Sequence, residues 1–262
     1  MTDTSAAQPA PGGGFLSVGN VIKRSFSAYL ANFVPFTILA LILYAPSLLL
    51  TSASVSVIPG MSAEVSVGSS AETPAELALL LLSMLLTYVL VGALVFGTVQ
   101  YLNDRRPGIG EIIGRGFSRI VPVIVIAILF SIAFGIGLAL LVIPGVFLLV
   151  VWSVVIPASV VERPGIIGAF SRSWNLTKGH RWSVLGVLLL LLAILVGFNL
   201  LVGILMGIAA FAVDSVLLVL VLNYVLSAIS GALMSVAIAV LYHDLRVAKE
   251  GVSTAQIAAV FD

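Results

Sequence analysis

The chain has no cysteine, only two histidines and few charged residues, which make up 9% of its 262 residues. Without cysteine there can be no disulfide, thiolate metal ligand or cysteine nucleophile. A soluble globular domain is excluded as well, since about a quarter of its residues would be charged. Hydrophobic residues instead make up 61% of the chain, and the mean hydropathy is +1.24. The composition predicts an all-α, polytopic transmembrane bundle with no metal site and no cofactor.

Long stretches without charge set the number of spans. Nothing between Arg119 and Glu162 is charged, and about 42 helical residues would reach roughly 63 Å, twice the hydrocarbon core of a bilayer. This stretch is therefore predicted to be a hairpin. We expect its turn at Ile143-Pro144-Gly145, because proline ends a helix and glycine permits a reversal.

The same argument predicts two spans on either side of this hairpin. The first begins near Phe33, and a loop at 52–73 separates it from a second that begins at Pro74, after an N-cap threonine and with Glu76 three residues beyond the cap. Between Arg181 and Arg246 only Asp214 is charged, which favours two long spans. Six spans result.

The basic residues fall in four clusters separated by pairs of spans. The clusters are Lys23 and Arg24; Arg105, Arg106, Arg115 and Arg119; Arg163, Arg172, Lys178 and Arg181; and Arg246 and Lys249. Positively charged loops remain in the cytoplasm. Both termini are therefore predicted to be cytoplasmic, with disordered or short tails at 1–14 and 251–262 and a transmembrane domain at 15–250.

A short pattern precedes each pair of spans: apolar, any residue, Arg, small, aromatic. Its copies are Ile22-Lys23-Arg24-Ser25-Phe26, Ile113-Gly114-Arg115-Gly116-Phe117 and Phe170-Ser171-Arg172-Ser173-Trp174. Such a segment is typical of an amphipathic helix lying in the membrane interface. We predict three repeats, at about 15–103, 104–162 and 163–246, each an interfacial helix followed by a transmembrane hairpin.

The candidate sites follow from this placement. Expected contacts to anionic lipid headgroups are Arg24, Arg115, Arg172, Lys178 and Arg181. An expected cytoplasmic ion-pair network contains Glu162, Arg163, Asp244 and Arg246. A stripe of small residues, Asn223, Ser227, Gly231 and Ser235, is expected to pack against another helix, as are Ala127, Ser131, Gly135 and Ala139, and Gly203 with Gly207.

One group of residues resembles a known family. It consists of Ile143-Pro144-Gly145, Trp152, Pro157, Val161-Glu162-Arg163, Ser171 to Gly179, and Leu241-Tyr242-His243-Asp244-Leu245-Arg246. Together they resemble the bacterial membrane domain fused to some glycerophosphodiester phosphodiesterases and its stand-alone YciC-like relatives. The resemblance implies a bacterial inner-membrane protein near phospholipid-derived substrates. It implies no phosphodiesterase activity, because that chemistry belongs to a separate soluble barrel.

Three function classes stay open. We expect a non-enzymatic membrane protein that binds anionic lipid or a membrane-protein partner and no nucleic acid, because no catalytic motif such as G-x-S-x-G is present. The second class is a transporter or channel for a neutral or lipid-like solute, because proline breaks in repeated hairpins are typical of transporters. The third is a lipid-modifying enzyme, which requires Glu162, Arg172, His180, Asp244 and Arg246 to converge.

Overall fold

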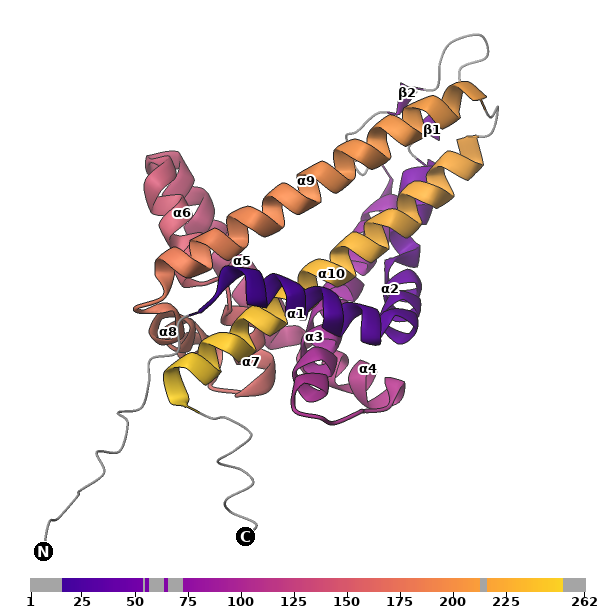
Figure 1. The fold of residues 1–262 in the computed structure, drawn as a ribbon. Helices are drawn as coiled ribbons and strands as arrows, with labels where there is room; N and C mark the ends of the chain where they lie inside the picture. Colours follow the sequence, from indigo (N-terminus) through magenta and orange to yellow (C-terminus); the bar gives the residue numbers. More distant parts are fainter. Residues whose placement is uncertain (1–15, 54, 57–63, 66–72, 213–215, 252–262) are drawn as a thin grey trace, which may run out of the picture.

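A computed structural model describes residues 16–53, 55–56, 64–65, 73–212 and 216–251, and these form an almost entirely helical molecule (Figure 1). Five helical segments are long and apolar enough to cross a membrane: Pro74–Leu102, Ile120–Leu140, Val142–Val161, Arg181–Leu205 and Leu220–Glu250. A sixth results if α1 (Val18–Ala31) and the start of α2 (Phe33–Ala53), bent by 81° where they meet, count as one span. The predicted helical architecture with membrane-length apolar segments is confirmed.

Three times along the chain, a helix of 10 to 14 residues precedes a helix of at least 21 residues. After α1 and α2 come α3 (Pro74–Leu102), α4 (Ile109–Ser118), α5 (Ile120–Leu140), α6 (Val142–Val151), α7 (Val155–Val161), α8 (Ile166–Thr177), α9 (Arg181–Ala212) and α10 (Val216–Glu250), so the shorter helices of the three pairs are α1, α4 and α8. Between α2 and α3 lies a small antiparallel ribbon of β1 (Val55–Ser56) and β2 (Glu64–Val65). The expected tail at 1–14, residues 252–262 and Asp214 lie outside the described residues.

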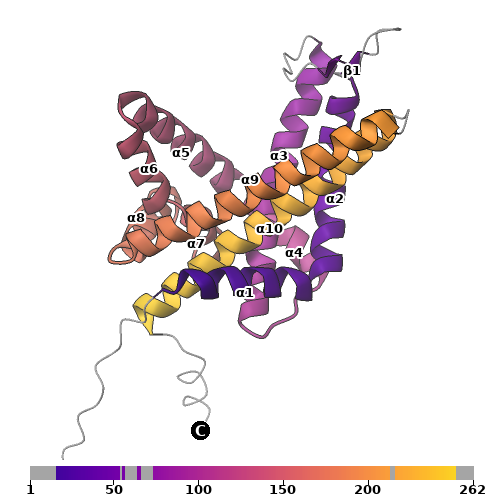
Figure 2. The same cartoon turned by 45° about the horizontal axis from the view of Figure 1, so that its top comes forward.

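The long helix α10 forms the centre of the packing. It contacts α1, α2 and α3, and the core between these helices contains Phe36, Leu90, Leu94, Val236 and Val240. The α5–α6 pair diverges from α2 and α3 (Figure 2). The short helices α1, α4 and α8 lie toward the end of the molecule opposite the β-ribbon (Figure 1). The elements that carry the basic clusters therefore gather at one end.

The start of α3 follows the sequence prediction. Thr73 Oγ1 accepts a hydrogen bond from Glu76 N at 3.2 Å, and Glu76 Oε2 accepts one from Thr73 N at 3.1 Å. This reciprocal capping satisfies two backbone donors that the helix leaves free. The predicted beginning at Pro74 is confirmed.

The predicted turn at Ile143-Pro144-Gly145 is wrong, because the chain reverses at Leu141. Pro144 lies in the first turn of α6, where a missing N–H costs no helical hydrogen bond. Gly145 serves the contact between the two helices, since a Cβ built on Gly137 would lie 3.1 Å from Gly145 Cα. Pro144 thus lies in the first turn of α6 and Gly145 packs against α5, so both residues belong to the helix that follows the reversal.

Two hydroxyl groups of α8 donate hydrogen bonds to the backbone at the break between α6 and α7. Pro157 has no N–H and its ring crowds the carbonyl four residues earlier, which disfavours a continuous helix here. Val155 N bonds to Trp152 O at 3.1 Å instead of the Val151 carbonyl. That carbonyl accepts from Ser173 Oγ at 2.8 Å and from Thr177 Oγ1 at 3.4 Å. The hydroxyls of α8 thus satisfy a backbone group that the break leaves without its helical donor.

The small residue of the three-copy pattern is buried in each copy. Ser25 and Ser173 are fully buried, and both hydroxyls donate to backbone carbonyls. A Cβ built on Gly116 would lie 2.6 Å from Val89 O of α3. The pattern therefore has a packing role that its sequence alone did not reveal: a small side chain lets α1, α4 and α8 approach the long helices.

We predict that Gly116→Ala separates α4 from α3 and destabilises the protein by about 1–3 kcal/mol, the usual cost of overpacking. The added methyl group would meet backbone, which cannot rotate away. Thermal unfolding in detergent measures the effect. Gly114→Ala is the matched control on the same helix, because a Cβ there meets no atom within 4 Å. Equal melting temperatures for the two variants would contradict the close contact.

Candidate functional site

A network of charges and one tyrosine joins α7, α8 and α10. Glu162 accepts two hydrogen bonds from Arg172, at 2.6 Å from Nε and 2.9 Å from Nη2. The hydroxyl of Tyr242 donates to Glu162 Oε1 at 2.6 Å. Arg172 also contacts Glu250, which accepts from Arg246 Nε at 2.8 Å. We call Glu162, Arg172, Tyr242, Arg246 and Glu250 the Glu162 network.

The network is only partly shielded from solvent. The Arg172 and Glu162 side chains retain 26% and 19% exposure, whereas Tyr242 is fully buried. Hydrogen bonding to Glu162 raises the pKa of the Arg172 guanidinium above its ordinary value. The guanidinium therefore stays charged, and its two parallel bonds to Glu162 fix the orientation of α8 against the end of α7.

A second ion pair joins α1 to α10. Arg24 Nη1 donates to Asp244 Oδ1, and the neighbouring His243 Nδ1 lies 3.4 Å from the same oxygen. The pair lies 220 residues apart in the sequence. It holds the first short helix along the last long one.

These contacts revise the expected ion-pair network. Glu162, Asp244 and Arg246 take part, but in two separate groups. Arg163 has a left-handed backbone with φ of 58° and no ion pair among the described residues. The sequence reasoning missed Tyr242 as a partner, since nothing local marks a tyrosine whose acceptor is 80 residues away.

The three arginines of the repeated pattern do not have equivalent surroundings. Arg24 and Arg172, both expected at lipid headgroups, are engaged by carboxylates of the protein. Arg115 lies over the Phe96 ring, with Cζ 5.3 Å from the ring centroid. Of the five residues required for an enzymatic boundary cluster, four divide between the two ionic groups. The fifth, His180, forms no ion pair with either group in the described part of the chain.

A different cation lies where α8 turns into α9. Gly179, with φ of 93°, allows the sharp turn that places Lys178, His180 and Arg181 together. Arg181 Cζ lies 4.6 Å from the Trp174 ring centroid and 5.0 Å from that of Phe147. We call Lys178, His180 and Arg181, with these two aromatic rings, the Arg181 corner.

Two side-chain nitrogens of the Arg181 corner have no hydrogen-bond partner among the described residues. They are Arg181 Nε and His180 Nδ1, and both are buried. Lys178 is exposed. Because buried polar atoms without partners are rare in native proteins, these two atoms make the Arg181 corner a candidate site.

An apolar groove of about 500 Å³ begins at Arg181 and runs between α6 and α9. Its lining includes Val142, Ile143, Phe147, Arg181, Trp182 and Leu185. Trp182 is 85% exposed and Ile143 79% exposed, so the groove opens at the surface of the bundle. One end thus carries a positive charge and the rest is hydrocarbon.

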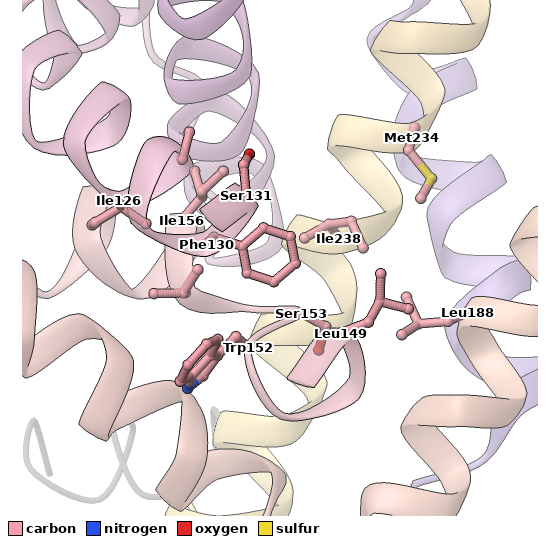
Figure 3. A pocket seen from close by; sticks show the side chains of 12 residues that line it. Ile126, Phe130, Ser131, Leu149, Trp152, Ser153, Ile156, Leu188, Met234 and Ile238 are labelled. Atoms are coloured by element: carbon pink, nitrogen blue, oxygen red, sulfur yellow. The ribbon is translucent and has the colours of Figure 1, made fainter. Parts of the chain in front are cut away.

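A second cavity, of about 220 Å³, lies between the α5–α6 pair and the α9–α10 pair (Figure 3). Its lining includes Ile126, Phe130, Trp152, Leu188, Met234 and Ile238. Trp152 makes edge-on contacts to Phe170 at 4.9 Å and to Phe130 at 6.4 Å between ring centroids. This aromatic column supports one wall of the cavity.

The small-residue stripes have different surroundings. A Cβ built on Gly231 would lie 2.6 Å from the Tyr44 hydroxyl of α2, and Ser235 is buried on the same side. Asn223 and Ser227 line a space of about 80 Å³ with Tyr44. By contrast, a Cβ on Gly135, Gly203 or Gly207 meets no atom within 4 Å, so these three lie outside the helix contacts of the described chain.

The described residues also contain no cluster of three or more His, Asp or Glu suited to a metal ion.

We predict that Glu162→Gln destabilises the protein more than Tyr242→Phe. The first change removes the charge that holds Arg172, whereas the second removes one hydrogen bond to a charged group, a loss of about 1.5–3 kcal/mol. Unfolding free energies in detergent at constant lipid content test this. Glu111→Gln is the control, because Glu111 is exposed on α4. A Glu162→Gln variant as stable as this control would show that the network contributes nothing.

Comparison with known proteins gives a family without an assigned role. No curated protein and no solved structure matches the chain. A family model described as a domain of unknown function, DUF7847, matches residues 14–245, which include the described helices almost to the end of α10. The chain therefore belongs to the DUF7847 family.

Proposed function

We propose that this protein is a non-enzymatic integral membrane protein that binds an anionic lipid, with the headgroup at the Arg181 corner. The observation that carries the proposal is the buried Arg181 Nε, which has no acceptor in the described chain and belongs to a side chain that lines an apolar groove. An arginine that already lies against two aromatic rings has lost most of its freedom before the ligand arrives. A phosphate oxygen is the acceptor that best fits a guanidinium in this position.

The charges of the other candidates favour this assignment. Arg24 and Arg172 are neutralised by Asp244, Glu162 and Glu250 and have little attraction left for a headgroup. The Arg181 corner has no carboxylate in ion-pair contact among the described residues. Of the headgroup contacts expected from sequence, the proposal keeps Arg181 and Lys178 at this site and leaves Arg115 as a peripheral cation.

The proposal includes a membrane placement. We place α1, α4 and α8 in the cytoplasmic interface and count six spans as three hairpins, with both termini inside a bacterial inner membrane. The gathering of these short helices at one end, opposite the β-ribbon, supports this placement (Figure 1). The Arg181 corner then lies at headgroup depth, where arginine and tryptophan are both favoured.

Two alternatives have weaker support. Transport of a solute would be supported by a polar path through the molecule. The groove and the cavity of about 220 Å³ instead expose mainly apolar side chains. A lipid-modifying enzyme would be supported by a convergent boundary cluster, but its acids and bases pair in two groups. The resemblance to the phosphodiesterase-associated membrane domain agrees with a lipid ligand and adds no reaction.

We predict that Arg181→Gln reduces the anionic phospholipid that copurifies with the protein. It should also reduce the rise in melting temperature on adding phosphatidylglycerol, because the uncompensated charge is gone while the shape of the groove remains. Native mass spectrometry and thermal unfolding measure the two effects. Arg106→Gln, at an exposed arginine in the turn before α4, is the matched control. An unchanged lipid complement in Arg181→Gln would overturn the proposed function.

The placement is tested by single cysteines, which are unambiguous because the natural chain has none. An impermeant maleimide added outside intact cells should label Glu64→Cys in the loop between the first two long helices. It should not label Ser118→Cys at the end of α4 until the membrane is permeabilised. Labelling of Ser118→Cys in intact cells would contradict the orientation.

A further inference from the structure

The groove and the cavity of about 220 Å³ lie along one face of α9. Arg181, Leu185 and Leu188 are spaced at i, i+4 and i+7, which places them above one another on one side of a helix. Arg181 and Leu185 line the groove, and Leu188 lines the cavity. On α6, Val150 lines the groove and its neighbour Leu149 lines the cavity. A chain that follows this face of α9 from the cation therefore arrives at the cavity.

The cavity walls are suited to hydrocarbon. Phe130, Leu188, Met234 and Ile238 come from three helices and point toward a common space (Figure 3). Ser153 donates its hydroxyl proton to Val150 O at 2.9 Å, so this donor is already used within the helix. A buried water needs two to four polar partners, whereas most residues of these walls are apolar.

We infer that the lipid at the Arg181 corner inserts one acyl chain into the cavity between the α5–α6 and α9–α10 pairs, so that this chain is withdrawn from the bilayer. The inference rests on the proposed function and names its ligand class: an anionic lipid with at least one long chain. Arg181 and Leu188 are seven residues apart, about 10 Å along the helix axis, so a short chain would end before the cavity. Charge complementarity selects the occupant, because the cation of Arg181 lies in the groove on this face of α9 and favours an anionic headgroup there.

The structure also shows why such a chain would stay. Met234 is unbranched and adapts to an irregular partner, and Phe130 and Trp152 present flat apolar surfaces. The α5–α6 pair, which supplies part of this wall, diverges from α2 and α3 (Figure 2). The bound lipid would then complete the packing between the two pairs of helices.

Photocrosslinking tests the inference. The probe is phosphatidylglycerol with a diazirine at the end of one long chain, mixed at low fraction into phosphatidylcholine nanodiscs that contain the protein. Peptide mapping should find the label on α5 and α10, at Phe130, Met234 and Ile238. A label confined to exposed residues such as Leu189 and Leu192 of α9 would overturn the inference.

Three variants separate this inference from the proposed function. Met234→Trp fills the cavity and should reduce cavity labelling at least fivefold while the copurified anionic lipid is retained. Ser131→Trp tests the same point from an exposed position on the lining, where folding is least affected. Arg181→Gln should reduce both labelling and lipid content. Retained cavity labelling in Ser131→Trp would refute the chain site alone, whereas full lipid retention in Arg181→Gln would refute the headgroup site.

Discussion

The hydrogen bonds to the Glu162 carboxylate are the interaction on which the arrangement of α7, α8 and α10 at the basic end of the molecule depends. A charged group at a membrane boundary must be satisfied by protein partners or by water, and Glu162 takes its partners from α8 and α10. Arg172 is thereby fixed on α8, and Trp174 lies two residues further on the same helix. Trp174 in turn contacts Arg181 at 4.6 Å. One carboxylate thus helps to hold the helix that carries an aromatic partner of Arg181, the first residue of α9.

This connection separates the cations into two kinds. Arginines paired with carboxylates serve as internal ties between helices distant in the sequence, and their charge is largely cancelled at short range. Arg181 lies against two aromatic rings, which stabilise a cation without cancelling its charge. The sequence shows the same residue type at both kinds of position. Only the fold determines which arginines remain available to an anion outside the chain.

The sequence was sufficient for features that follow from length and local chemistry. Uncharged runs of known length predicted the long helices, and Thr73 with Glu76 predicted where α3 begins. Features that depend on distant contacts were missed. The reversal at Leu141 precedes Pro144 because Gly145 is needed against Gly137, and the role of Tyr242 depends on a carboxylate in another helix. The Arg181 corner was expected as one cation among five, since its aromatic partners lie on two other helices.

The divergence of the α5–α6 pair connects these findings. In a bilayer, apolar side chains gain little by leaving lipid for one another, so helices stay together through small residues, hydrogen bonds and ion pairs. The α5–α6 pair has Gly137 against Gly145 within itself, and α7 and α8 join it to the rest through the Val151 carbonyl and the Glu162 network. These ties lie toward the basic end. Farther along, no comparable polar contact closes the described space between Phe130 and Met234. A hydrocarbon chain is the partner that fits such mainly apolar walls.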